Sequence, residues 1–304
     1  MNQDGHQRLN ELSGKTAFVT GGASGIGLGM VEAFLADGMN VVIADLSEPH
    51  LDEARLRLAS HATATHFMRL DVADRAAMAA AADEAEAAFG KVHVLCNNAG
   101  VSSYLPMDVA SYADWDWMLG VNLHGVINGI VSFLPKLRKH GEGGHIVNTA
   151  SIAGLVPAPA WGGIYSTAKF AVHGLSGSLR LSVGQHGIGV TVVCPGATKS
   201  NIRQSEQLRP HKYASAAHQK APMPALSEIG IDPLDLGRLV VAAIRRNDPY
   251  VIAHAENKAH VQAFVEEMLS CFPDEKIIDE GRLSYIRWFD EQVALARQLQ
   301  PRQL

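Results

Sequence analysis

Short, wholly apolar segments alternate with helical patterns along most of this 304-residue chain, and this alternation constrains the fold more than any other feature. Strands without a polar face must be buried on both sides, which is typical of a parallel sheet covered by helices. Right-handed crossovers then produce a doubly wound α/β sheet. Strands are expected at Thr16–Thr20, Val41–Ala44, Thr65–Leu70, Val92–Cys96, His145–Thr149, Val190–Cys194 and Tyr250–Ala253, and helices at Gly27–Leu35, Leu51–Leu58, Arg75–Phe89, Trp115–Leu137, Tyr165–Gln185 and Pro233–Arg245.

Composition and charge exclude several classes of protein. Hydrophobic residues make up 47% of the chain and charged residues 19%, an ordinary globular mixture. A net charge of −5 and a pI near 6.3 argue against nucleic-acid binding, because such domains are usually basic. The polar N-terminus lacks a signal-peptide core, and no apolar run reaches the roughly 20 residues that span a bilayer. The sequence therefore predicts a cytoplasmic protein without a nucleic-acid or membrane partner.

The chain is expected to form one catalytic domain over residues 13–255, followed by a helical C-terminal extension of that domain over 256–304. Residues 196–231 are long, polar and interrupted by prolines, which indicates a lid over a substrate site. A basic lid would attract a phenolate or carboxylate substrate, although a solvated basic loop has the same composition. The cations of the lid are Lys199, Arg203, Arg209, Lys212 and Lys220, against the single acid Glu206.

A glycine-rich loop, Thr20–Gly27 (TGGASGIG), joins the first predicted strand to the first helix. Glycines there permit a tight turn and a close approach to a pyrophosphate, which the helix N-terminus binds. Asp45 follows Gly27 by 18 residues, near the spacing of a ribose-binding acid. Its carboxylate would accept both ribose hydroxyls of NAD and repel the 2′-phosphate of NADP, and Leu46 supplies no compensating cation. The loop therefore predicts a dinucleotide site that prefers NAD.

Tyr165 and Lys169 lie four residues apart, on one face of a predicted helix. The pKa of an ordinary tyrosine is about 10, and a nearby cation lowers it by stabilising the phenolate. Ser151 follows the fifth strand, so it lies at the carboxyl edge of the sheet, where ligands bind in such folds. Its hydroxyl can bond a reacting oxygen while Tyr165 exchanges a proton with that oxygen.

These motifs together resemble the short-chain dehydrogenase/reductase family over about residues 13–253. The resemblance implies a single-domain Rossmann-like fold, an NAD-dependent alcohol dehydrogenase or ketoreductase, a small-molecule substrate, and a homodimer or homotetramer. The motifs that carry it are the glycine-rich loop, Asp71, Asn97–Gly100 (NNAG), Asn122, Ser151, Tyr165 with Lys169, and Pro195–Gly196.

The same resemblance implies a role for each site residue. Tyr165 is the acid/base, Ser151 orients the substrate oxygen, and Lys169 binds the nicotinamide ribose and lowers the pKa of Tyr165. Asn122 holds a relay water through a local break in its helix, and the cofactor itself carries the hydride. The implied cofactor-binding residues are Gly21, Ser24, Gly25, Ile26, Gly27, Asp45, Asp71, Val72, Asn98, Ala99, Gly100, Tyr165, Lys169, Pro195, Gly196, Thr198 and Ser200.

Three stretches, residues 114–137, 144–154 and 199–213, resemble more narrowly the Cα-dehydrogenases of bacterial lignin β-aryl-ether breakdown. Those enzymes oxidise a bulky benzylic secondary alcohol to a ketone with NAD. The predicted substrate contacts are Tyr104 and Trp161, whose rings can stack on an aryl group, and Arg203 of the lid. The Ser151–Tyr165 spacing is one residue longer than is usual in the family, in a loop beside the substrate site. The alternatives are an enzyme for another bulky substrate (steroid, terpenoid or polyol) and a non-catalytic NAD-binding sensor or scaffold.

The segment His140–His145 (HGEGGH) contains residue types that bind metals. It lies in a glycine-rich turn and not on one helix face, so its side chains are not preorganised as ligands. No metal site is expected there. Cys96, Cys194 and Cys271 lie far apart and are expected to be buried, inert thiols.

Overall fold

The computed structural model describes residues 9, 11–215, 229–274 and 279–300, and the predicted doubly wound sheet forms within them. Seven strands of this described part form one parallel sheet in the order β3-β2-β1-β4-β5-β6-β7. The order reverses between β1 and β4, which places a ligand crevice at their carboxyl ends. The strands are β1 (Thr16–Thr20), β2 (Asn40–Asp45), β3 (Thr65–Arg69), β4 (Val94–Asn97), β5 (Gly144–Thr149), β6 (Ile188–Val193) and β7 (Tyr250–Val251).

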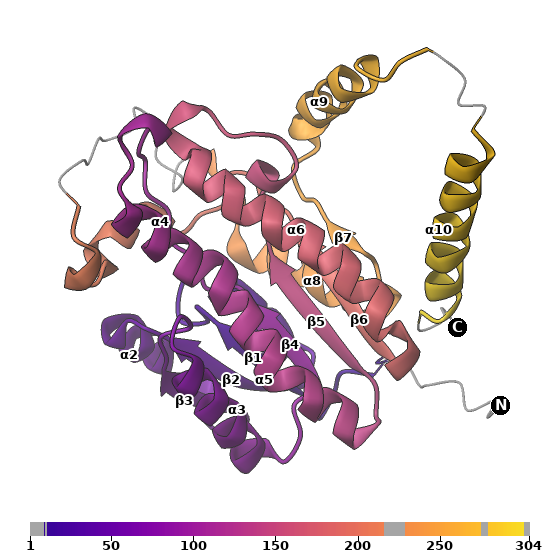
Figure 1. Cartoon of the computed structure of the whole chain (residues 1–304). Coiled ribbons are helices and arrows are strands. Elements are labelled where there is room, and N and C mark those ends of the chain that lie inside the picture. The colour runs from indigo at the N-terminus through magenta and orange to yellow at the C-terminus, as the bar shows by residue number, and fades with distance from the viewer. Residues whose placement is uncertain (1–8, 10, 216–228, 275–278, 301–304) are drawn as a thin grey trace.

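Helices cover both faces of the sheet, and strands such as β1, β5 and β6 are therefore buried along their whole length. Figure 1 shows α3, α5 and α6 side by side across one face. On the other face, α1, α2 and α8 pack against the sheet in a second apolar core. The helices are α1 (Gly25–Ala36), α2 (Glu48–Arg57), α3 (Arg75–Phe89), α4 (Tyr112–Leu119), α5 (Gly125–His140), α6 (Gly163–Val183), α8 (Pro233–Arg246), α9 (Lys258–Ser270) and α10 (Glu280–Gln298).

Helices α1 and α8 approach so closely that their backbones are in contact. A Cβ atom added to Gly29 would lie 2.1 Å from the carbonyl oxygen of Pro233, and one added to Gly237 would lie 2.2 Å from the carbonyl oxygen of Gly29. Only glycine therefore fits at these two positions. The contact joins an early and a late segment of the chain in one apolar core, which contains Met30, Val31, Phe34, Leu236, Val240 and Ile244.

The single helix predicted over Trp115–Leu137 is interrupted. Helix α4 ends at Leu119, a π-turn spans Gly120–His124, and α5 continues from Gly125. By length and apolar composition alone, the described stretch Tyr112–His140 is capable of crossing a bilayer. It packs instead against α3 and α6 within the fold, as core helices of this length do, and so does not indicate a membrane span.

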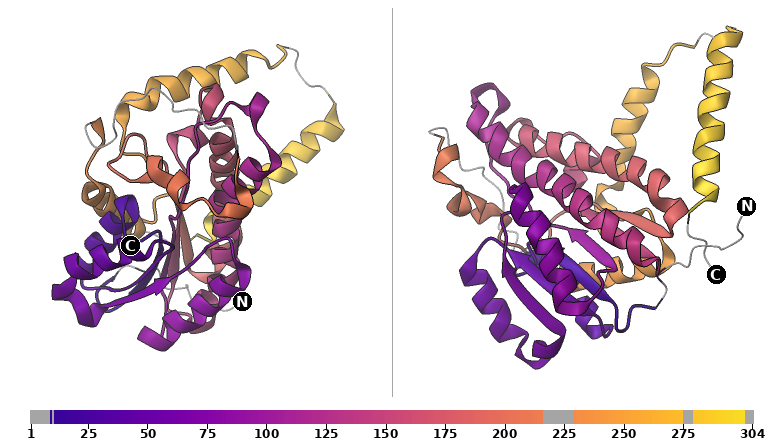
Figure 2. Two further views of the ribbon diagram at one scale, coloured as in Figure 1. Left: turned by 90° about the vertical axis from the view of Figure 1, so that its left-hand side faces the viewer. Right: turned by 60° about the horizontal axis from the view of Figure 1, so that its bottom comes forward.

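The segment after β6 has more structure than a polar loop. Short 3₁₀ helices form at Ile202–Leu208 and His211–Tyr213, and Thr198 forms a backbone bridge with Ile231. Residues 216–228, with the predicted lid cation Lys220, lie outside the described residues, as do 275–278 and 301–304 of the predicted extension. Figure 2 shows the helices of that extension, α9 and α10, projecting from the body of the protein, which they contact at α6. Cys271, which follows α9, is exposed, so the expectation that all three thiols are buried is wrong for this one.

Candidate active site

The glycine-rich loop brings backbone, and not side chains, to the crevice between β1 and β4. Gly21 has a φ of 61°, and an added Cβ would lie 2.9 Å from Cα of Ala99. A Cβ on Gly27 would lie 2.0 Å from the carbonyl oxygen of Gly21. Thr20 Oγ1 accepts hydrogen bonds from the N–H groups of Asn98 (2.9 Å) and Ala99 (3.0 Å), which ties this loop to the end of β4.

A cavity of about 480 Å³ lies at this carboxyl edge of the sheet. Ser151 and every predicted cofactor residue except Gly27 line it, so residues far apart in the sequence are brought together. Because Gly21 and Gly27 have no Cβ, the backbone beside the N-terminus of α1 stays open to close approach. A pyrophosphate needs such an approach. The residues present therefore fit a dinucleotide.

Asp45 is buried at the end of β2, and its carboxylate is fixed by the backbone. Its Oδ2 accepts from the N–H of Ala23 (3.2 Å), and its Oδ1 accepts from the N–H of Ser47 (3.0 Å). The sequence did not predict a cation beside Asp45, but Arg69 is its partner in the neighbouring strand β3. The Nε of Arg69 donates to the Leu46 carbonyl at 3.3 Å. Arg69 is exposed and does not line the cavity, whereas Asp45 does.

Tyr165, Ser151 and Lys169 meet at the end of β5. The hydroxyls of Ser151 and Tyr165 are hydrogen-bonded. Lys169 Nζ donates to the Thr149 carbonyl at 2.9 Å and lies 5.4 Å from the centre of the Tyr165 ring. Ser151 Oγ also donates to the Pro195 carbonyl at 3.4 Å. The first turns of α6 thus bring the phenol and the ammonium group to the carboxyl end of β5.

The pKa of Tyr165 differs from the sequence-based expectation. Burial raises the pKa of Tyr165 to about 12, and the hydrogen bond with Ser151 offsets only part of that rise. Burial also lowers the pKa of Lys169 to about 8. The expected lowering of the pKa of Tyr165 by its cationic neighbour is therefore wrong for this structure, because desolvation is the largest cause and the group that opposes it is Ser151, not Lys169. At neutral pH the phenol carries its proton.

Asn122 lies in the π-turn, which is the helix break that the family pattern implied. Its side chain is fully buried and does not line the cavity. Its Oδ1 accepts from the N–H of Val101 (3.1 Å), and its Nδ2 donates to the carbonyl of Val101 (2.9 Å). The amide therefore holds the backbone that follows Gly100, a contact that sequence reasoning missed.

The three predicted substrate contacts lie outside the cavity wall. Tyr104 and Trp161 pack on each other with ring centres 5.3 Å apart, and Arg203 is half-buried in the lid. The aromatic residues that do line the cavity, apart from Tyr165, are Trp117 and Tyr213. Trp117 was predicted only as part of a helix, so its position facing the lid could not be read from periodicity alone.

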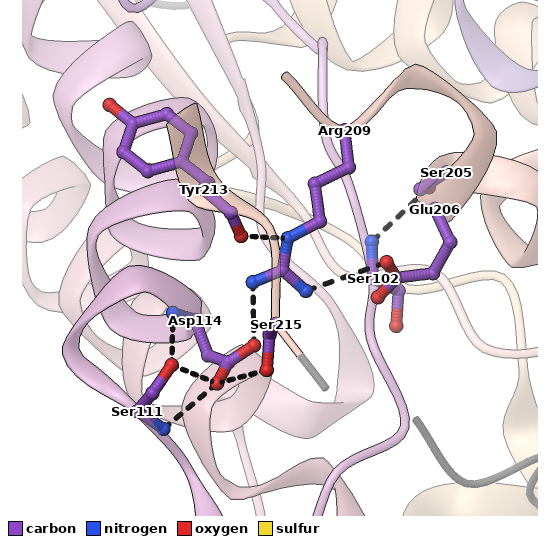
Figure 3. A network of polar contacts seen from close by, with 8 residues as sticks. All are labelled: Ser102, Ser111, Asp114, Ser205, Glu206, Arg209, Tyr213 and Ser215. Atoms are coloured by element: carbon purple, nitrogen blue, oxygen red, sulfur yellow. Dashed lines mark hydrogen bonds and ion pairs between the residues drawn. The ribbon is translucent and has the colours of Figure 1, made fainter. Parts of the chain in front are cut away.

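A buried ion pair fastens the described part of the lid to α4 (Figure 3). Arg209 donates to Asp114 at 2.5 Å and to the Tyr213 carbonyl at 2.7 Å, and its guanidinium lies 4.7 Å from the Trp117 ring centre. The side chains of Arg209 and Asp114 are 5% and 1% exposed. Arg209 is therefore neither offered to a substrate nor solvated, which corrects both sequence-based interpretations of the lid at this residue.

Asp114 is stabilised as a carboxylate. Burial alone would raise its pKa, but hydrogen bonds from Ser111, Arg209 and Ser215 together lower it. Ser111 and Asp114 also form the capping box at the start of α4. A second attachment of the lid is the hydrogen bond from the N–H of Ser102 to Ser205 Oγ (3.2 Å). Of the predicted lid cations, Lys212 is the one that lines the cavity in the described residues.

The HGEGGH segment lies at the opposite edge of the sheet and forms an ion-pair cluster. Glu142 accepts hydrogen bonds from Lys15, Lys91 and His93, which lower its pKa far below the usual range. His140 Nε2 bonds the Val92 carbonyl at 3.0 Å. Within the described residues, no group of three or more His, Cys, Asp or Glu side chains has the arrangement of a metal site.

A model of the short chain dehydrogenase family matches residues 15–210 of this chain. The chain belongs to the short-chain dehydrogenase family. Its glycine-rich loop, Ser151, Tyr165 and Lys169 are therefore parts of an oxidoreductase fold that binds a nicotinamide cofactor.

Three known proteins are similar to this short-chain dehydrogenase over most of its length. It is 36% identical over 270 residues to "C alpha-dehydrogenase" of Sphingobium sp. (strain NBRC 103272 / SYK-6), which covers 86% of this chain and 88% of the relative. The apo structure of LigO from strain SYK-6 is 39% identical with a TM-score of 0.75, over 92% and 97% of the two chains. A short chain dehydrogenase/reductase from Burkholderia phymatum in complex with NAD is 32% identical with a TM-score of 0.81, over 88% and 99%.

Proposed function

We propose that this protein is a cytoplasmic, NAD-dependent oxidoreductase that interconverts a bulky aryl (benzylic) secondary alcohol and its ketone, as in Cα oxidation of lignin β-aryl ethers. The observation that carries the proposal is the meeting of Ser151 and Tyr165 in a cavity that the glycine-rich loop and Asp45 also line. The similarity to "C alpha-dehydrogenase" and to LigO supports the choice of substrate class.

In the proposed reaction, Ser151 bonds the alcohol oxygen, and the phenolate form of Tyr165 takes the hydroxyl proton as the carbonyl forms. In the reverse direction, the phenol returns that proton to the oxygen. The ammonium group of Lys169 favours the phenolate, and the residues that line the cavity along β1 and β4 would hold the dinucleotide. NAD, when bound, accepts the hydride from the carbinol carbon.

The cavity wall supports a bulky aromatic substrate. Trp117, Leu208 and Tyr213 supply apolar and aromatic surface, and Lys212 lies over the Tyr213 ring at 4.8 Å from its centre. Aromatic rings offer stacking surface to an aryl group, and a cation at the same wall favours a phenolate. Tyr104 and Trp161 stand next to this wall and not in it.

The experiment that tests the function is a 340 nm assay with NAD or NADP, a racemic β-aryl-ether alcohol, and a panel of steroid and polyol alcohols. NAD-dependent ketone formation from the aryl ether that stops near half conversion is the expected result, and it shows use of one enantiomer. Turnover of only the other alcohols would overturn the aryl-ether proposal. No turnover across the panel, with NADH still bound, would favour a sensor or scaffold over an enzyme.

Replacing Asp45 with serine is expected to change the cofactor preference. The serine removes the charge that repels a 2′-phosphate and leaves the neighbouring Arg69 in place. The ratio of kcat/KM for NAD to that for NADP should fall by about 10–100-fold. Steady-state kinetics with both cofactors measure this ratio, and Asp52→Ser, at an exposed acid of α2, serves as control. An unchanged ratio would refute the assignment of Asp45.

The pH profile should follow the pKa values of Tyr165 and Lys169. Alcohol oxidation uses the phenolate beside a charged lysine, so kcat/KM should rise about tenfold per pH unit up to about pH 8. Above that pH the lysine loses its charge and the rise should level off. Ketone reduction uses the protonated phenol beside the charged lysine, so its kcat/KM should be flat below about pH 8 and fall above it as Lys169 loses its charge. Profiles in both directions from pH 6 to 10 measure this, and a flat oxidation profile below pH 8 contradicts it.

We further propose that the protein is a homo-oligomer in which α9 and α10 take part. None of the residues of these two helices is buried, and both carry large exposed apolar side chains. On a monomer, so large an apolar surface usually marks an interface. The exposed side chains on α10 are Tyr285, Ile286, Trp288, Phe289 and Leu295.

The double substitution Trp288→Glu and Phe289→Glu is therefore expected to lower the molar mass of the protein in solution, from that of the oligomer to that of the monomer. Light scattering after size exclusion should show the oligomer for the wild type and the monomer for this variant. Leu56→Glu, at a side chain that is 81% exposed on α2, should leave the mass unchanged. A monomeric wild type, or an oligomer that survives the double substitution, would contradict the role of α10.

A further inference from the structure

The segment Pro195–Thr198 follows β6 and lines the cavity at the end where Ser151 lies. A histidine from another part of the chain packs behind this segment. His254 follows β7, which pairs with β6 so that the N–H of Cys194 donates to the carbonyl of Val251 at 2.9 Å. The pairing brings the imidazole against the backbone of Gly196, where it is only 2% exposed.

Both ring nitrogens of His254 bond this backbone. The N–H of Gly196 donates to Nδ1 at 3.0 Å, and Nε2 lies 2.8 Å from the carbonyl oxygen of Ala197. A backbone N–H can only donate and a carbonyl can only accept, so Nδ1 is unprotonated and Nε2 carries the hydrogen. A Cβ added to Gly196 would lie 2.8 Å from Cγ of His254, so the ring can reach this backbone only because residue 196 is glycine.

Because peptide groups are planar, these two hydrogen bonds also fix the orientation of backbone groups in the active site. In a trans peptide the C=O and N–H groups point in opposite directions. Holding the N–H of Gly196 therefore aims the carbonyl of Pro195 away from His254, where it accepts from Ser151 Oγ (3.4 Å) and from the N–H of Ile152 (2.9 Å). Holding the carbonyl of Ala197 likewise turns the N–H of Thr198 away from the imidazole.

We propose that His254 is a positioning residue: through Gly196 and Ala197 it sets the backbone that lines the cavity beside Ser151, where the reacting end of the cofactor would bind, and the oxygen that orients Ser151. The inference rests on the proposed function. His254 does not line the cavity and acts only through this backbone. The carbonyl of Ala197 has a second donor, the N–H of Ile231 at 3.0 Å, so the bond from Gly196 carries most of the effect.

The test compares His254→Leu, His254→Asn and a matched control, His93→Leu. Leucine fills the space without an acceptor and leaves the buried N–H of Gly196 without its partner, whereas asparagine offers a carbonyl oxygen in place of Nδ1. His93 is also a buried histidine bonded at both ring nitrogens, to the N–H of Thr16 and to Glu142, but at the opposite edge of the sheet. NADH binding by fluorescence titration, thermal midpoints and steady-state kinetics are measured for all four proteins.

His254→Leu is expected to raise the Kd for NADH by about tenfold and to lower kcat as well, because Ser151 loses its fixed acceptor. His254→Asn should recover most of both. His93→Leu should lower the thermal midpoint and leave the Kd unchanged. The same Kd for His254→Leu and wild type, or an equal rise in His93→Leu, overturns the inference. A wild type that does not bind NADH overturns the proposed function instead, so the two failures are distinguishable.

Discussion

Replacing Tyr165 with phenylalanine is expected to reduce kcat for alcohol oxidation by about 10²–10⁴-fold. The substitution removes the oxygen that bonds Ser151 and exchanges the proton, and it keeps the ring. NADH binding should change little, because the ring and Lys169 stay in place. Single-turnover and steady-state kinetics, together with an NADH titration, measure the two effects separately.

A matched control for this substitution is Tyr112→Phe. Tyr112 is 87% exposed on α4, so the loss of its hydroxyl should leave turnover, binding and stability as in the wild type. Full turnover by Tyr165→Phe would refute the acid/base assignment. A loss of NADH binding in that variant would mean that the phenol serves the cofactor and not the proton transfer.

Replacing Arg209 with methionine is expected to cost about 3–5 kcal/mol in the free energy that holds the lid on α4. The substitution leaves the carboxylate of Asp114 buried without its cation. Hydrogen exchange of the backbone amides in the lid should accelerate, and the KM for the substrate should rise, because Tyr213 and Leu208 lose their fixed positions in the cavity wall. Exchange measured by mass spectrometry and denaturant unfolding quantify the loss.

Two comparisons isolate the ion pair from the loss of side-chain volume. Asp114→Asn combined with Arg209→Met removes both charges and should recover part of the loss, whereas Arg238→Met breaks an exposed pair and should change little. Because the pKa of Asp114 is lowered, the ion pair stabilises the folded protein at pH values above the ordinary pKa of an aspartate, which is about 4. This stabilisation is lost as the pH falls. Equal lid exchange in wild type and Arg209→Met at pH 7 would refute the role of the pair.

The fold was predictable from the sequence because each level of the pattern agreed. The wholly apolar strands, the glycine-rich loop and the helix faces all require the same doubly wound sheet, and β1 was predicted at its observed bounds. The π-turn at Gly120–His124 was not predicted as an element, because a single turn contains too few residues for its period to be recognised in a sequence. Only the resemblance of Asn122 to a family pattern indicated a break there.

The positions of the predicted cofactor residues in the cavity wall were easier to predict than those of the predicted substrate contacts. Asp45 ends β2 and Ser151 follows β5, and parallel strands place their carboxyl ends at one edge regardless of the loops. Trp161 lies in a loop, and Arg209 in the lid, whose positions depend on long-range contacts. A sequence does not reveal that Arg209 pairs with an acid 95 residues away, or that burial raises the pKa of Tyr165.

The glycine contact between α1 and α8 has a consequence for biosynthesis. The apolar surface of α1 emerges early from the ribosome, but its cover on α8 is translated on the order of 10–40 s later. During that interval the nascent chain exposes the residues that later form one of its two main cores. Completion of this core is therefore delayed until translation is nearly finished, and a chain that stops short of α8 should aggregate or be captured by chaperones.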